Sequence, residues 1–100
     1  MVATRLQFPF WILVMRDQTP WRGVMLTPGQ VASFSDHTRA GDFLMAAANP
    51  AWEVRLVTPS TLDSIAASFA RQGVEGFTLD PDESGVGIEI DYRFAMVQVA

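Results

Sequence analysis

The chain has 100 residues, 49% of them apolar, and its 11 acidic and 7 basic residues give a net charge of −4. A chain of this length buries about two thirds of its unfolded surface, so we expect a single domain, residues 1–100, around one core. The absence of cysteine excludes disulfides and Cys-ligated metal sites, and the scattered Arg residues lack the concentrated basic surface of nucleic-acid binders.

The N-terminal stretch MVATRLQFPFWILVM has the outline of a signal peptide, with one Arg ahead of an apolar run. The unbroken run is short, however, and the following RDQTPW offers no small-residue cleavage site. A membrane-spanning helix needs about 20 apolar residues, and no window approaches that length. We therefore expect a cytoplasmic protein that does not bind membranes.

Three strands are predicted first. Residues 10–15 (FWILVM) lack polar alternation, which is typical of a central strand covered on both faces. Residues 21–26 form a second strand, which Gly23 weakens, and the turn sequence TPGQ at 27–30 leads into a third strand at 31–34.

A helix is predicted next, because Ser35 can cap it and Asp36 then lies in its first turn, beside the positive end of the helix dipole. Asn49 and Pro50 end it. Its apolar residues have the spacing i, i+3, i+4 and i+7: Ala40, Phe43, Leu44 and Ala47.

Apolar and polar side chains alternate along residues 52–57 (WEVRLV), which predicts a strand with one solvent-exposed face. Glu53 and Arg55 are predicted to lie on the solvent-exposed face. The residues predicted to face the core are Trp52, Val54 and Leu56.

A second helix begins at Thr58 as N-cap with Pro59 in its first turn, although Ser60 and Asp63 have capping-box spacing and offer another start. Gly73 ends it as a left-handed cap. Its predicted buried stripe is Leu62, Ile65, Ala66 and Phe69.

Residues 76–79 and 87–92 predict two further strands, and the apolar tail 93–100 predicts a last edge strand. The order is β-β-β-α-β-α-β-β. We therefore predict an α+β domain, in which two helices pack against a mixed β-sheet of about five to six strands.

The acidic stretch LDPDESGVGIEID, residues 79–91, resembles a calcium loop in its spacing. Asp80, Asp82, Ser84 and Asp91 occupy the first, third, fifth and twelfth positions of such a loop. A calcium loop lies between two helices, whereas strands are predicted on both sides here. We interpret it as a hairpin loop and expect no metal or other cofactor, with a calcium site formed by these four residues as the alternative.

His37 follows Ser35 and Asp36 directly, but catalytic triads are built from residues distant in sequence, so we interpret it as an exposed histidine at a helix start. Acid–base chemistry between His37 and the carboxylates of Asp36, Asp42 or Glu53 is the enzymatic alternative. No dinucleotide fingerprint or Walker lysine occurs. We predict that the protein is not an enzyme.

Two tryptophan-containing segments are candidate interaction sites. Trp21 and Arg22 lie in the turn TPWRG, and Trp52 begins a strand after NPA. Partly exposed Trp beside Arg is typical of interaction hot spots. The alternative is that both tryptophans close the ends of a small core.

The segments VASFSDHTRAGDFL (31–44), VRLV (54–57) and GVEGFTLDPD (73–82), with the Pro-started helix, resemble the SseB N-terminal-type domain of bacteria over residues 10–90. The chain departs from that family in having Asp80 where Asn often precedes Pro, and in the longer segment 17–26. The resemblance implies a small cytoplasmic α/β fold with an auxiliary or protein-binding role. It supplies no catalytic residues.

These observations predict a non-catalytic protein-interaction or accessory domain with a protein partner. We expect a homodimer, in which the apolar segment FAMVQV, residues 94–99, is an exposed edge that pairing would cover. The alternative is a regulatory module that binds calcium, or a small ligand in a pocket between sheet and helices.

Overall fold

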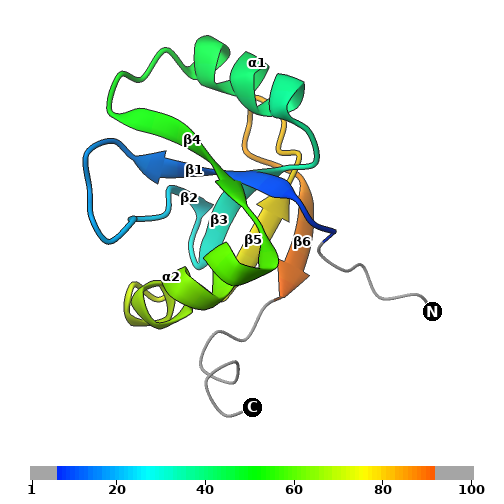
Figure 1. Cartoon of the computed structure of the whole chain (residues 1–100). Coiled ribbons are helices and arrows are strands. Elements are labelled where there is room, and N and C mark those ends of the chain that lie inside the picture. Colours follow the sequence, from blue (N-terminus) through cyan, green and yellow to red (C-terminus); the bar gives the residue numbers. More distant parts are fainter. Residues whose placement is uncertain (1–6, 92–100) are drawn as a thin grey trace, which may run out of the picture.

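The computed structural model describes residues 7–91, which form one mixed sheet and two helices (Figure 1). The elements in chain order are β1 (Phe10–Met15), β2 (Met25–Thr27), β3 (Gln30–Phe34), α1 (His37–Ala47), β4 (Trp52–Val57), α2 (Pro59–Arg71), β5 (Gly76–Leu79) and β6 (Ile88–Asp91). The predicted α+β class and the predicted element order are confirmed. The predicted strand in the tail 93–100 lies outside the described residues.

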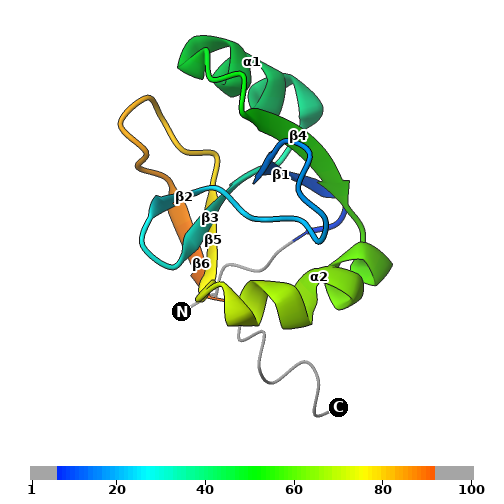
Figure 2. The same ribbon diagram turned by 90° about the vertical axis from the view of Figure 1, so that its left-hand side faces the viewer.

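The sheet has the strand order β4-β1-β3-β5-β6, with β2 beside β3. β3 and β5 run parallel, and the other pairs are antiparallel. Helix α1 lies on one face of the sheet and α2 on the other (Figure 2). β1 is therefore covered above and below, as its run of apolar residues predicted.

The face covered by α2 holds the larger core cluster. The predicted stripe of α2 is fully confirmed, since all four of its residues are buried. They pack against side chains of the sheet, notably Phe10, Val31 and Phe77. The rings of Phe10 and Phe77 meet edge to face with their centroids 5.3 Å apart.

The face covered by α1 holds a second cluster, in which Leu13, Ala32, Phe34 and Ala40 are buried. Phe43 and Leu44 of α1 are half-buried against this cluster, while Ala47 of the predicted stripe is exposed. The stripe therefore turns away from the sheet at its C-terminal end. That end of α1 borders a groove in the surface.

The second strand is shorter than predicted. Residues 22–24 pair with β1 instead, since Met15 N–H donates to the Arg22 carbonyl and Val24 N–H donates to the Leu13 carbonyl. The pairing of β1 with β3 is limited to two residue pairs, Trp11 with Phe34 and Ile12 with Ser33. The segment leading into β2 fills the space where these two strands diverge.

The start of α1 corrects the prediction. The N-cap is Asp36, whose carboxylate accepts a hydrogen bond from Arg39 N–H at 2.8 Å, and Ser35 lies outside the helix. Ser35 is instead bonded to Asp80, a residue 45 positions away that local sequence patterns do not reveal. The predicted start of α2 is correct, because Thr58 caps it and Pro59 is its first residue.

The end of α2 also follows the prediction. Gly73 has a left-handed φ of 83°. Its N–H donates to the Ala70 carbonyl and Val74 N–H donates to the Phe69 carbonyl. These two bonds form the Schellman arrangement that satisfies the last carbonyls of a helix.

Strand β4 has the predicted bounds, but its faces are only partly as predicted. Trp52 and Val54 pack in the α1-face cluster, whereas Leu56 is 45% exposed. On the other face Arg55 is exposed and Val57 is fully buried. The physical reason is that β4 is the edge strand of the sheet, and helix α1 covers only part of it.

Within residues 7–91, neither helix is long and apolar enough to cross a lipid bilayer.

Candidate functional site

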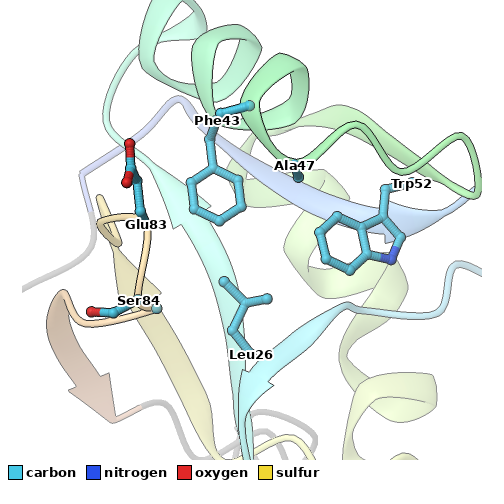
Figure 3. A pocket seen from close by; sticks show the side chains of 8 residues that line it. Leu26, Phe43, Ala47, Trp52, Glu83 and Ser84 are labelled. Carbon is cyan, nitrogen blue, oxygen red and sulfur yellow. The ribbon is translucent and has the colours of Figure 1, made fainter.

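A groove lies between α1 and the loop that joins β5 to β6 (Figure 3). We call it the α1 groove. It has a volume of about 460 Å³, and its lining residues are Leu26, Phe43, Ala46, Ala47, Trp52, Glu83, Ser84 and Gly85. These residues come from four separate parts of the chain, namely β2, α1, the start of β4 and the β5–β6 loop.

The floor of the α1 groove is apolar. Figure 3 shows the rings of Phe43 and Trp52 and the side chain of Leu26 around one hollow, with Ala47 above it. Phe43, Trp52 and Leu26 are all half-buried members of the α1-face cluster, so the core holds them in place while leaving part of each exposed. The groove therefore presents apolar surface on rigid elements.

One wall of the groove is the acidic loop, residues 80–87. Asp82 orders its tip, because one carboxylate oxygen accepts bonds from Ser84 N–H at 2.9 Å, Ser84 Oγ–H at 2.7 Å and Val86 N–H at 3.1 Å. The backbone adds bonds from Asp82 N–H to the Val86 carbonyl and from Gly85 N–H to the Asp82 carbonyl. These bonds fix the position of Glu83 and Ser84 at the rim.

The base of the acidic loop is tied to the start of α1. Asp80 Oδ1 accepts from Ser35 N–H at 2.9 Å and Asp80 Oδ2 accepts from Ser35 Oγ–H at 2.7 Å. Asp80 N–H also donates to the Ser33 carbonyl. The two sides of the groove are thus linked by hydrogen bonds as well as by the sheet.

The hairpin interpretation of the acidic stretch is confirmed. β5 and β6 pair antiparallel, and Gly76 is opposite Asp91 while Leu79 is opposite Ile88. Asp91 therefore lies at the end of β6 far from the loop, so the first and twelfth positions of the calcium pattern are not brought together. Among residues 7–91, no three His, Asp or Glu side chains gather as a metal-binding group.

A neighbouring hollow continues the groove along α1. It has a volume of about 400 Å³ and shares Phe43, Ala46 and Glu83 with the α1 groove. The remaining residues that line it are Phe34, Arg39, Asp42, Asp80, Pro81 and Asp82. The acidic side chains of both hollows outnumber the one basic side chain, and Arg39 is paired with Asp36 at 3.2 Å.

The three interaction candidates are not brought together. Trp52 lines the α1 groove, whereas Trp21 packs against the cluster on the opposite face of the sheet. There the guanidinium of Arg55 lies 5.8 Å from the centre of a Trp21 ring, within cation–π distance. Arg22 is exposed. Trp21 and Trp52 are each half-buried.

The consecutive residues Ser35, Asp36 and His37 do not assemble as a catalytic group. His37 is exposed at the start of α1, as predicted, and meets the ring of Trp11 edge to face at 6.0 Å. Ser35 Oγ–H donates to Asp80, and Asp36 caps the helix.

The hydrogen bonds within the acidic loop affect the pKa of the Asp82 carboxyl group. They lower the pKa of Asp82, with the Ser84 hydroxyl as the largest cause, followed by the N–H groups of Val86 and Ser84. Because the pKa of Asp82 is lowered, the charged carboxylate stabilises the folded loop at pH values above the ordinary aspartate pKa of about 3.9. That contribution is lost as the pH falls through the lower pKa of the folded state.

Replacing Ser84 with Ala is therefore expected to raise the pKa of Asp82 toward its ordinary value. Carboxyl carbon NMR across an acid titration measures this directly. Ser64→Ala is the matched control, since Ser64 bonds the Ser60 carbonyl in α2 and should leave Asp82 unchanged. An Asp82 pKa that does not move in the Ser84 variant would contradict the assignment.

Comparison with known proteins shows no relative: no protein-family model matches the chain, and no curated protein or solved structure matches it significantly.

Proposed function

We propose that the protein is a non-catalytic protein-binding domain, and that the α1 groove and the adjoining hollow receive an extended segment of a partner. That segment would carry apolar side chains together with at least one Arg or Lys. The observation that carries this proposal is an apolar floor walled by an acidic loop. The predicted accessory role in the cytoplasm and the resemblance to SseB N-terminal-type domains remain part of the same proposal.

The apolar half of the recognition rests on the floor of the groove. Aromatic side chains that are held rigidly and left partly exposed are typical anchors of interfaces. Phe43 and Trp52 have this character, and Leu26 completes the surface between them. An apolar side chain that enters here gains burial without any rearrangement of the core.

The basic half of the recognition rests on charge. Asp42, Asp80, Asp82 and Glu83 line the two hollows, and the only cation among the lining residues is Arg39, which Asp36 already engages. Charge complementarity across an interface steers association and excludes partners of the wrong sign. A cationic side chain fits this rim, and an acidic one would be repelled.

The shape favours an extended segment over a compact molecule. The two hollows adjoin through shared residues and together run along α1. Several lining residues are exposed, including Ala46, Ala47, Glu83 and Ser84, so the site is an open groove. A bound segment lying along it would contact both hollows at once.

The test is selection of displayed random peptides on the purified protein. We expect the selected peptides to combine an aromatic or aliphatic residue with Arg or Lys, and their affinity to fall as salt is added. Ala47→Arg places a long cation in the groove and should abolish binding of these peptides. Met45→Arg is the matched control on the same helix, because Met45 is 81% exposed and does not line the groove.

Two results would reject the proposal: no enrichment of peptides, or selected peptides that bind the Ala47 and Met45 variants equally well. A small apolar cation is the second candidate ligand, because the volume of the α1 groove falls within the range of about 300–1,000 Å³ seen for small-molecule sites. Binding of such a cation, with no enrichment of peptides, would favour a ligand-binding regulatory module.

A further inference from the structure

The outer edge of the sheet at β4 offers a second interaction surface. It presents backbone hydrogen-bonding groups, whereas the α1 groove presents apolar and acidic side chains. β4 is the terminal strand, and Figure 2 shows it at one side of the sheet with β5 and β6 at the other. An edge strand presents backbone N–H and C=O groups that another strand can pair with.

The observed hydrogen bonds show which groups of β4 point outward. Arg16 N–H donates to the Ala51 carbonyl, so residues 51, 53, 55 and 57 direct their backbone groups toward β1. The Leu13 carbonyl, opposite Val54, accepts from Val24 on the far side of β1, in agreement with this alternation. Trp52, Val54 and Leu56 therefore direct their backbone groups away from the sheet.

Among residues 7–91, the N–H groups of Val54 and Leu56 have no hydrogen-bond partner, while Trp52 N–H donates to the Asn49 carbonyl. The side chain of Leu56 is 45% exposed on the same strand. The outward backbone groups of Val54 and Leu56 and the side chain of Leu56 are thus available to contact another chain.

The order of charges along β4 is self-complementary. Glu53 and Arg55 flank Val54 on the α2 side of the sheet, and within one chain they form an ion pair at 3.0 Å. If two copies of β4 run antiparallel with Val54 opposite Val54, Glu53 of each copy lies opposite Arg55 of the other. Trp52 of each copy then lies beside Leu56 of the other, which covers the exposed leucine.

The neighbouring registers are excluded by charge. The outward backbone groups stay paired when one copy of β4 slides by two residues along the other. A slide in one direction places Glu53 opposite Glu53, and a slide in the other direction places Arg55 opposite Arg55. Like charges directly opposite each other destabilise a strand pair. Of these three registers, only the one centred on Val54 places opposite charges across the strand pair.

Arg55 is also held in place before any association. Its guanidinium lies 3.0 Å from a carboxylate oxygen of Glu53 and 5.8 Å from the centre of a Trp21 ring. Preorganisation of a long side chain reduces the entropy that binding removes.

We propose that two copies of this chain form a dimer through their β4 strands, paired antiparallel about Val54, so that their sheets become one continuous sheet. The dimer has two-fold symmetry, and both copies present α1 on the same side. This interface differs from the segment 94–99 that the sequence suggested, which lies outside the described residues. The proposal does not depend on the α1 groove or on its ligand.

The test is the oligomeric state of the full chain, measured by sedimentation equilibrium, for charge variants of β4. The unsubstituted protein is expected to be a dimer at high micromolar concentration. Glu53→Arg alone places like charges at both cross-strand pairs, and so does Arg55→Glu alone. Each should weaken dimerisation by about tenfold or more, because two attractive pairs become repulsive.

Two rescues separate the dimer from a role of the ion pair within one chain. The double variant E53R/R55E restores both cross-strand pairs and should dimerise like the original. An equimolar mixture of the two single variants should form a heterodimer, since each variant supplies the charges that the other lacks. The intramolecular ion pair stays broken in both partners of that mixture.

Circular dichroism of each variant shows whether it is folded. If one single variant fails to fold, the other single variant, compared with the double variant and the unsubstituted protein, still decides the matter. A monomer at high micromolar concentration overturns the proposal. So does dimerisation that the single variants leave unchanged, or a mixture of folded single variants that stays monomeric.

Discussion

Replacing Phe69 with Ala is expected to lower the free energy of unfolding by about 3–5 kcal/mol. Phe69 is 0% exposed at the centre of the α2-face cluster. Removing its ring takes away apolar contacts and leaves a cavity that the surrounding strands cannot close. Because small domains are stable by only about 5–15 kcal/mol, this one change removes a large share of the stability.

Urea denaturation of the variant measures this loss, and Phe8→Ala is the matched control. Phe8 is 40% exposed, so its truncation removes less buried apolar area than at Phe69 and opens no enclosed cavity, and the expected loss is about 1.5 kcal/mol or less. Equal losses at the two positions would contradict the placement of the core between α2 and the sheet.

Replacing Gly87 with Ala is expected to cost about 1–3 kcal/mol and to displace the acidic loop. A Cβ at this position would lie 2.5 Å from the Leu79 carbonyl oxygen and 3.0 Å from two backbone atoms of Pro81. These neighbours are main chain, so relief requires the loop itself to move. Glu83 and Ser84 would then leave their positions at the rim, and we expect the affinity of the α1 groove for its peptide ligands to fall.

Gly41→Ala is the control, since a Cβ at Gly41 would meet nothing within 4 Å. Gly41 is inside α1, where Ala stabilises a helix by about 0.5–1 kcal/mol relative to Gly. The same chemical change should thus have opposite signs at the two sites. Thermal unfolding of both variants tests this, and a Gly87 variant as stable as the original would contradict the loop structure.

Local signals in the sequence predicted the helices and their order well. α2 follows its sequence closely because Thr58, Pro59 and Gly73 define its ends by backbone chemistry alone. The central position of β1 also followed from its composition, since only a strand covered on both faces has no need of polar residues.

Predictions that depended on distant residues were less accurate. Ser35 has the chemistry of an N-cap, but its hydroxyl and N–H bond to Asp80, and Asp36 caps the helix instead. Leu56 has the alternation of a core residue, but at the edge of the sheet it remains exposed. A local sequence pattern shows neither the hydrogen-bond partner of Ser35 nor the position of β4 at the edge of the sheet.

The α1 groove was not predicted, and no contiguous motif encodes it. Trp52 was a candidate for interaction, yet Leu26, Phe43 and Glu83 became its neighbours only through the sheet topology. The acidic stretch was correctly interpreted as a hairpin loop. Its part in forming a wall of the groove could be seen only when the loop was placed beside α1.

The most direct test of the proposed binding site uses the indole N–H signals of the three tryptophans in nitrogen-15 NMR. A peptide selected on the protein is titrated into the labelled chain. If the α1 groove is the binding site, the signal of Trp52 shifts while those of Trp11 and Trp21, which do not line the groove, stay in place. A shift of the Trp21 signal with Trp52 unchanged would place the ligand on the other face of the sheet and contradict the account.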